Sequence, residues 1–298
     1  MNTKNTKTAV IILLIAANIF FIYNIMRLKI NTENIPSDMI DDAVGVLSRN
    51  GLAADKSRIP AKKPVYFIYE GAYSGTVQED IIKSFSGVTE EKYDETVKMY
   101  VPAGISYAAG EYRFIFSDAD YFSLSINAGE EPLEEIRPLP EGGMGKIESG
   151  AAKATEKTIG DFIKKYNKQD AKLGFEVIGL EEDKYIWIKQ TVGGEPLDSH
   201  IAYIEIRDGE VKYFSGRWYF GELTIAAKKM PLLDSVNILF KSMEADKNII
   251  SGDRLWGMSA EYTVMAHEME SFYLVPSWRL EFESGLALSY NMVTGNKN

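Results

Sequence analysis

The sequence predicts an α+β protein in which an N-terminal transmembrane helix precedes two exported domains of antiparallel sheet with helices packed on one face. Three observations lead to this prediction. An uncharged apolar run occupies residues 8–26. Stretches with helical periodicity are each followed by short segments rich in β-branched and aromatic residues. A segment rich in proline and glycine near residue 140 separates two such groups.

The composition is that of a packed protein and excludes several kinds of site. The chain has 298 residues, of which 45% are apolar and 26% charged, enough for one large domain or two ordinary ones. It has no cysteine, which excludes disulfides, zinc–thiolate sites and thiol nucleophiles. It has two histidines, His200 and His267, which excludes a multi-histidine metal site. We therefore expect no cofactor, no metal and no enzymatic activity.

Charge is distributed unevenly along the chain. Residues 1–30 contain four basic residues and no acidic one. The remaining 268 residues hold 29 of the 33 basic groups and all 43 acidic groups, a formal net charge of −14. Because nucleic acids are polyanions, we expect no nucleic-acid partner for a chain this acidic.

Residues 8–26 are predicted to span the membrane. The segment has 19 residues and no charge, and at ~1.5 Å per residue it is ~28 Å long, close to the ~30 Å hydrocarbon core. A cleaved signal peptide would have a shorter apolar run and a small-residue cleavage site, whereas Arg27 and Lys29 follow here. We expect residues 1–7 to form a cytoplasmic head. The rest of the chain is then extracellular and held at the cell membrane by one span.

Two asparagines lie within this apolar run. Asn24 is close to its end, where a polar side chain is tolerated near the interface, but Asn18 is nearer the middle. An amide in hydrocarbon can hydrogen-bond a neighbouring helix for ~0.6–2 kcal/mol. Asn18 and Asn24 are therefore candidate contacts with a transmembrane partner.

The first exported domain is predicted over residues 31–137. A helix is expected at 37–50, with Ser37 as its cap, because its apolar residues form one stripe: Met39, Ile40, Ala43, Val44 and Leu47. A capping box at 76–79 predicts another helix. Strands are expected at 65–69, 112–116 and 121–126.

A linker at 138–150 and a second domain at 151–298 follow. Helices are expected from residue 152 and from Pro231. The Asp208-Gly209 pair is the best hairpin signal in the chain. The four tryptophans lie in this half, and we expect them in the core. Strands are expected near 175–179, 185–192, 201–206, 211–220, 272–275, 278–283 and 286–293.

Three short motifs suggest chemistry that their context does not support. Asp198, Ser199 and His200 are the residue types of a catalytic triad, but triad groups normally converge from separate segments, so a turn is the preferred interpretation. The glycines at 142–145 lack the spacing of a phosphate loop. Asp118-Ala-Asp120 lacks the rest of a calcium loop. We predict no catalytic, cofactor-binding or metal-binding residue.

Two stretches carry a resemblance to known proteins. The first is YIWIKQTVGGEPL at 185–197, followed by IAYIEIRDGEV at 201–211 and by Trp218. It is similar to the PepSY-like pattern of an aromatic strand ending in Gln, a glycine turn with Pro, a second strand and a D-G turn. The second is VPSW at 275–278 with YNMVTG at 290–295, which resembles the end of such modules.

Together with the apolar run and the helix at 37–50, the layout resembles the YycI members of the YycH/YycI family. These are single-span accessory regulators of the WalK sensor histidine kinase in Gram-positive bacteria. The resemblance implies regulation by contact with a sensor histidine kinase and a YycH-like protein, through the spanning helix and the extracellular part. The resemblance assigns no functional residue to this chain. A homodimer is also possible for a protein of this kind.

Two other function classes remain as alternatives. An exported PepSY module that acts as a chaperone or peptidase inhibitor, for example in the control of spore or cell-wall hydrolases, would bind a client protein instead of a kinase. A cell-envelope hydrolase is disfavoured because the sequence has no catalytic set.

Overall fold

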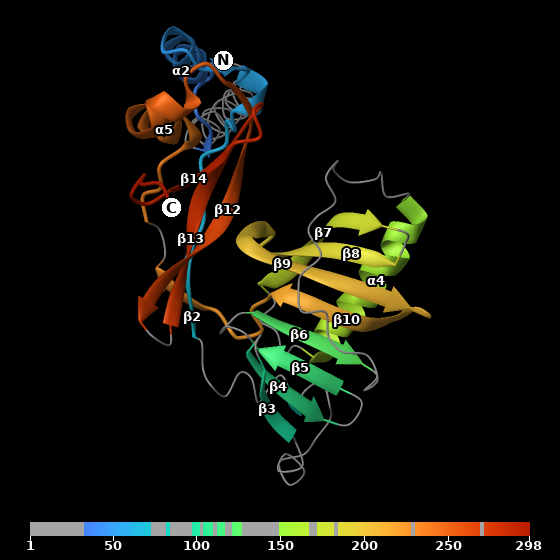
Figure 1. Ribbon diagram of the computed structural model, residues 1–298. Helices are drawn as coiled ribbons and strands as arrows, with labels where there is room; N and C mark the ends of the chain where they lie inside the picture. Colours follow the sequence, from blue (N-terminus) through green and yellow to red (C-terminus); the bar gives the residue numbers. More distant parts are fainter. Residues whose placement is uncertain are drawn as a thin grey trace, which may run out of the picture. The chain divides into compact units, whose positions relative to one another are not determined.

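The computed structural model describes residues 33–72, 82–83, 97–101, 104–109, 112–116, 121–126, 149–166, 172–181, 184–227, 230–268 and 271–298 (Figure 1). It is a mixed α+β structure with mostly antiparallel strands, which confirms the predicted class. None of the helices among these residues combines the length and apolar character needed to cross a membrane. The predicted span at 8–26, with Asn18 and Asn24, lies outside the described residues.

The described chain forms two compact units, each assembled from segments distant in sequence. Unit 1 comprises residues 33–66, 231–259 and 278–298, and unit 2 comprises 67–230 and 260–277. This division differs from the predicted one. The strands predicted at 121–126 and 211–220 fall in different predicted domains, yet the observed strands there, 121–126 and 210–217, pair as neighbours in one sheet. Of the predicted linker, only residues 149–150 are described.

Unit 2 contains an antiparallel sheet in the order β7–β8–β9–β10–β6–β5–β4–β3. The β9–β10 turn has left-handed backbone at Asp208 (φ 53°) and Gly209 (φ 76°), which confirms the hairpin predicted there. The strands are β3 (Val97–Val101), β4 (Gly104–Ala109), β5 (Tyr112–Phe116), β6 (Tyr121–Ile126), β7 (Leu173–Glu181), β8 (Tyr185–Val192), β9 (Glu195–Arg207) and β10 (Glu210–Arg217).

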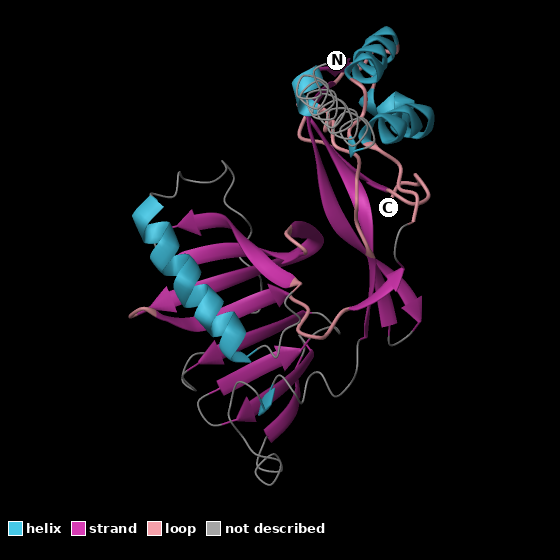
Figure 2. Ribbon diagram, turned by 180° about the vertical axis from the view of Figure 1, so that it is seen from behind, coloured by secondary structure: helices cyan, strands magenta, loops and turns pink. Residues whose placement is uncertain are grey.

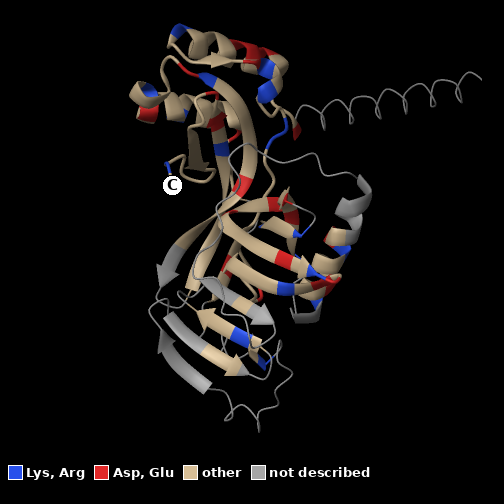
Figure 3. Cartoon of the chain, turned by 45° about the vertical axis from the view of Figure 1, so that its right-hand side comes forward, with Lys and Arg blue, Asp and Glu red and all other residues tan. Residues whose placement is uncertain are grey.

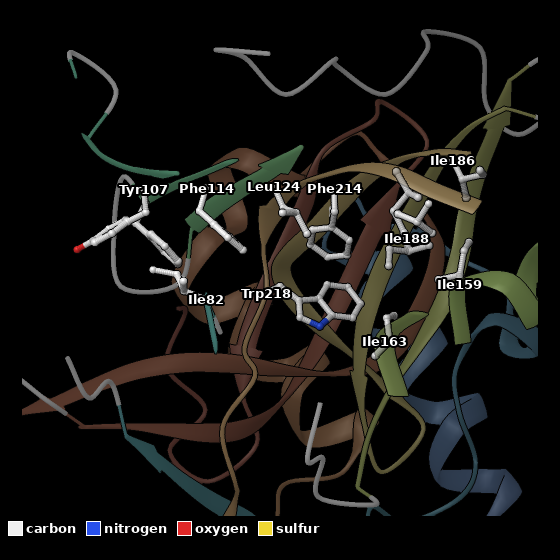
Figure 4. Close-up of a cluster of buried hydrophobic side chains, with 14 residues drawn as sticks. Ile82, Tyr107, Phe114, Leu124, Ile159, Ile163, Ile186, Ile188, Phe214 and Trp218 are labelled. Atoms are coloured by element: carbon white, nitrogen blue, oxygen red, sulfur yellow. The ribbon is translucent and has the colours of Figure 1, made fainter. Parts of the chain in front are cut away.

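Helix α4 (Ser149–Tyr166) lies across one face of this sheet (Figure 2). Its buried Ile159 and Ile163 pack against the strands and form one core with the ring of Phe214. Figure 4 shows these side chains pointing toward one another from helix and sheet. Since such burial contributes roughly 1.5–3 kcal/mol per large apolar side chain, this core positions the strands of unit 2. On β8, β9 and β10 a second buried cluster is aromatic: Trp187, Tyr203 and Tyr213.

Further strands of the fold follow the order β11–β2–β13–β12. They are β11 (Thr224–Ala227), β2 (Ile68–Ala72), β13 (Ser271–Phe282) and β12 (Arg254–Glu268). The two long strands β12 and β13 contribute residues to both units. The other part of each strand lies in unit 1, where β12 also pairs with β1 (Ala53–Ala54) in parallel.

Unit 1 adds helices α2 (Ser37–Arg49) and α5 (Ser235–Ile250), the short helix η1 (Lys56–Arg58) and strand β14 (Ala287–Asn291). Helices α2 and α5 lie beside each other (Figure 1). The buried face of α2 is the predicted stripe, represented by Ile40, Ala43 and Leu47. The predicted Ser37 cap is wrong: no side chain caps α2, and Ser37 Oγ instead accepts a hydrogen bond of 2.8 Å from Lys56 Nζ.

Two boundaries in unit 1 also differ from the sequence prediction. Helix α5 begins at Ser235 instead of Pro231, because the Asp234 side chain caps it by accepting from Asn237 N at 2.9 Å. Strand β13 runs unbroken through Pro276, where the sequence predicted two strands.

Candidate interaction surface

The free side of β11 offers a backbone edge in unit 2. β11 pairs antiparallel with β2, with Thr224 opposite Glu70 and Ile225 opposite Tyr69. Within the described ranges, no strand lies on its other side. A sheet edge presents backbone N–H and C=O groups, so an extended segment of another chain can pair with it.

Apolar side chains accompany this edge. Phe67 and Ile225 are 38% and 36% exposed. The ring of Phe67 lies 6.2 Å from that of Tyr69, and Ile225 is the cross-strand partner of Tyr69. Phe67 and Ile225 therefore project from the same face of the strands. We call Phe67, Ile225 and the β11 backbone the edge surface.

Buried contacts behind the edge surface hold it in place. The ring of Tyr69, itself buried, packs 5.6 Å from that of Tyr262, whose hydroxyl donates to the Phe67 carbonyl at 3.2 Å. Lys172 Nζ lies 5.8 Å from the centre of the Tyr69 ring and donates to the Leu223 carbonyl at 2.8 Å. These bonds hold Leu223, which precedes β11, and Phe67, which precedes its partner strand β2.

Several features restrict which chains can pair with this edge. The strand has four residues, and a bulge at Ala226 interrupts its register with β2. Lys228 and Lys229 follow it in sequence. Short length, bulges and lysines are the usual means by which proteins prevent indiscriminate strand pairing. The edge surface therefore favours a short, selective protein contact anchored by apolar side chains.

The Asp198-Ser199-His200 stretch lies in an irregular part of β9. The pairing between β8 and β9 shifts register here. Ser199 is exposed and has left-handed backbone (φ 60°). His200 is 2% exposed, and its Nδ1 lies 3.2 Å from the Asp198 carbonyl oxygen. Ser199 and His200 thus differ sharply in exposure, and the imidazole contacts backbone, which favours the structural interpretation.

A charged cluster on β8 and β9 is likewise structural. Buried Glu205 receives hydrogen bonds from Arg207 Nε at 2.8 Å and Lys184 Nζ at 3.0 Å. Burial alone would raise the pKa of Glu205, but the two cationic donors hold it below its ordinary value. The carboxylate therefore stays ionised and paired. No group of three or more potential metal-ligating side chains occurs in the part of the chain that the structure describes.

Unit 1 exposes one tryptophan, contrary to the expectation that all four lie in the core. Trp187, Trp218 and Trp278 are at most 3% exposed, whereas Trp256 on β12 is 54% exposed. The guanidinium carbon of Arg58 lies 4.9 Å from the centre of its ring, a cation–π contact.

Sequence reasoning did not predict the edge surface. Strand β11 is too short and too poor in alternation to stand out, although Thr224 and Ile225 have high β propensity. The pair Lys228-Lys229 was an available signal, because lysines often flank an edge strand.

Comparison with known proteins identifies no family. No protein-family model matches the chain, and no curated protein is significantly similar to it. Among solved structures, it is similar to an uncharacterized protein from Eubacterium rectale, at 11% identity and a TM-score of 0.48 over 83% of this chain and 90% of that one. This similarity points to no activity.

Proposed function

We propose that the protein is a membrane-anchored extracellular regulator that modulates a sensor histidine kinase by direct contact. The 19-residue uncharged segment at 8–26 is the observation that carries this proposal. The YycI-like layout supports the choice of a sensor kinase and a YycH-like protein as partners. In this proposal the two units lie outside the cell, and residues 8–26 hold them beside the spanning helices of the kinase.

The edge surface supports regulation by contact. Phe67 and Ile225 expose apolar area on one face of an edge strand, and the neighbouring backbone can add a short strand of a partner. A bound regulator shifts a kinase equilibrium only if it binds the active and inactive states unequally. The proposed role therefore requires that the segment recognised by β11 be available in one kinase state and covered in the other.

The absence of native cysteine permits a direct test of the contact. An Ile225→Cys variant, labelled with a photoactivatable maleimide in intact cells, is expected to cross-link to the sensor kinase or the YycH-like protein. Glu176→Cys on the exposed part of β7 is the matched control and should not cross-link. Equal cross-linking at both positions, or none to either partner, would remove the edge surface from the proposal. A peptidase or other client captured at Ile225 would favour the chaperone or inhibitor alternative.

The same labelling tests the topology. A membrane-impermeant maleimide added to intact cells should label Ser259→Cys, which is exposed in unit 1, but not Asn5→Cys in the head. Lysis before labelling should make both positions reactive. Labelling of Asn5→Cys with protection of Ser259→Cys in intact cells would reverse the proposed orientation and exclude an extracellular role.

A further inference from the structure

The exposed Trp256 lies in a basic part of an otherwise acidic chain. Residues 56–63 of unit 1 contain four basic residues and no acidic one. Lys56 is neutralised locally, since its Nζ lies 2.6 Å from the Asp41 carboxylate. Arg58 stacks on Trp256, and Lys62 and Lys63 form no ion pair within the described residues. Elsewhere on the described chain, basic and acidic residues are interspersed (Figure 3).

Lys62 and Lys63 lie beside the point at which the described chain starts. Lys62 forms an isolated antiparallel β-bridge with Asn34, and Lys63 N donates to the Glu33 carbonyl at 2.8 Å. Glu33 comes seven positions after Met26, the end of the proposed anchor. A chain of seven residues spans at most ~25 Å. If the anchor is in the membrane, Glu33 is therefore within ~25 Å of its surface, and the two lysines lie beside Glu33 and Asn34.

We propose that Arg58, Lys62, Lys63 and Trp256, here called the basic–aromatic patch, bind the anionic headgroups of the lipid bilayer that holds the anchor. This inference rests on the proposed function. Tryptophan prefers the headgroup region, where its ring is buried and its N–H is solvated. Arginine and lysine gain attraction to anionic lipid within a Debye length of the surface.

Tethering makes such a contact effective even if it is weak. The anchor turns headgroup binding into an intramolecular step with a high effective concentration of lipid. Arg58 connects the two parts of the patch: its guanidinium covers Trp256, and it is four residues from Lys62, hence within ~14 Å along the backbone. Bound in this way, unit 1 would be held against the membrane and would have a restricted orientation.

Trp256 is a selective reporter of this binding. It is exposed, the other three tryptophans are buried, and residues 1–32 contain none. The full chain is reconstituted in vesicles of phosphatidylcholine with or without 30% phosphatidylglycerol, and acrylamide quenching of its fluorescence is measured. The Trp256→Phe variant identifies the Trp256 component. We expect at least a twofold smaller quenching constant in the anionic vesicles, and recovery at high salt.

Charge variants test the lysines. Lys62→Gln with Lys63→Gln should restore acrylamide access in anionic vesicles, because each basic group near such a surface strengthens binding about fivefold. Lys157→Gln with Lys164→Gln removes the same charge from exposed positions on α4 and should leave protection intact. Equal loss in both variants would mean that net charge, and not the patch, is responsible, and would overturn the proposal.

A flotation assay, which measures whether the chain stays with the vesicles, distinguishes a wrong proposal for the basic–aromatic patch from a wrong proposal for the anchor. If the chain floats with the vesicles after alkaline extraction but Trp256 is equally accessible in both lipids, headgroup binding is excluded and the anchor stands. If the chain does not float with either lipid, the anchor and the lipid contact both fail.

Discussion

The ring of Phe272 on β13 covers Gly71, its cross-strand partner on β2. A Cβ atom added at Gly71 would lie 2.3 Å from Phe272 Cζ. The ring cannot easily move, because it is 1% exposed and packs edge-on against Tyr219, with 4.9 Å between ring centres. Since β2 also carries Tyr69 and supports β11, this close approach positions the edge surface.

Gly71→Ala should therefore destabilise the protein by ~1–3 kcal/mol, the usual cost of overpacking a buried site. Denaturant unfolding of the purified chain measures the change. Gly45→Ala is the control, because the site on exposed α2 has open space and alanine favours a helix, so stability should stay equal or rise by up to ~1 kcal/mol. A Gly71→Ala protein as stable as wild type would show that the Phe272 ring can move aside.

Asp246 gives unit 1 a pH-dependent contribution to stability. Its carboxylate accepts from Tyr290 Oη at 2.5 Å and from Lys297 Nζ at 3.0 Å. Burial raises the pKa of Asp246, but these two hydrogen bonds outweigh it and hold the pKa below its ordinary value. Because the pKa of this carboxyl is lower in the folded than in the unfolded protein, it stabilises the fold at pH values above the unfolded pKa of ~3.9. This stabilisation is lost as the pH falls through the folded pKa.

The stability difference between wild type and Asp246→Asn should therefore be largest near neutral pH and shrink progressively below about pH 5. Thermal or denaturant unfolding across pH 3–7 measures it. Asp161→Asn on exposed α4 controls for the loss of one negative charge. A difference that grows on acidification would contradict the assigned sign.

The side chain of Gln190 pairs with the backbone of Tyr219 in both directions. Gln190 Nε2 donates to the Tyr219 carbonyl at 2.7 Å, and Tyr219 N donates to Gln190 Oε1 at 2.9 Å. Gln190→Met, of similar volume, would leave two buried backbone groups without these partners and should cost ~2–5 kcal/mol. Gln190→Glu should approach wild-type stability at low pH, where a protonated carboxyl can again donate to Tyr219. Equal deficits at pH 4 and pH 7 would argue against this pairing.

Short-range sequence patterns correctly predicted the helices and turns whose apolar or turn-forming residues follow the expected spacing. The apolar stripe that ends at Leu47 predicted α2, and the Asp208-Gly209 pair predicted the β9–β10 hairpin. Both elements are determined by residues close together in sequence. Strand β12 was not predicted. It buries the charged Glu261 at 2% exposure and exposes the apolar Trp256 at 54%, so residue type along this strand does not follow the side on which each residue lies.

The larger organisation depends on contacts between distant segments. Ser235 Oγ donates to the Pro60 carbonyl at 2.7 Å, and Trp278 Nε1 donates to the Leu233 carbonyl at 3.0 Å. The first bond brings residue 235 back to residues 33–66, and the second joins β13 to the residues before α5. No local pattern in the sequence reports either bond. The same limit applies to the edge surface, because the exposure of Ile225 follows from which strand lies beside β2 and not from its own neighbours.

Ser199 offers a test of whether the Asp198-Ser199-His200 stretch has any chemistry. If the stretch is structural, Ser199→Ala should leave stability within ~0.5 kcal/mol and leave the proposed kinase regulation unchanged, because the exposed hydroxyl supports no packing. Phosphorylation of the kinase in cells measures the second quantity. A folded Ser199→Ala protein that no longer regulates the kinase would restore a nucleophilic role for Ser199.

Asn18 tests whether the proposed anchor is also a contact. Lipid does not distinguish apolar helices of equal length, so a simple tether would tolerate any of them. An unpaired amide in hydrocarbon costs several kcal/mol, on the order of a lost buried hydrogen bond. A bond to a neighbouring helix recovers ~0.6–2 kcal/mol and fixes an orientation. Asn18 should therefore face a helix of one of the proposed partners, the kinase or the YycH-like protein, and Asn24, nearer the interface, should matter less.

Asn18→Leu is expected to leave insertion and abundance unchanged but to reduce recovery of that partner by about three- to thirtyfold, the equivalent of the hydrogen bond. Phe21→Leu, which changes an apolar residue one helical turn away, should have a much smaller effect. Partner recovery from detergent-solubilised membranes at equal expression is the measurement. Equal recovery with Asn18→Leu would reduce residues 8–26 to a tether and would place the whole of the proposed regulatory contact on the two units.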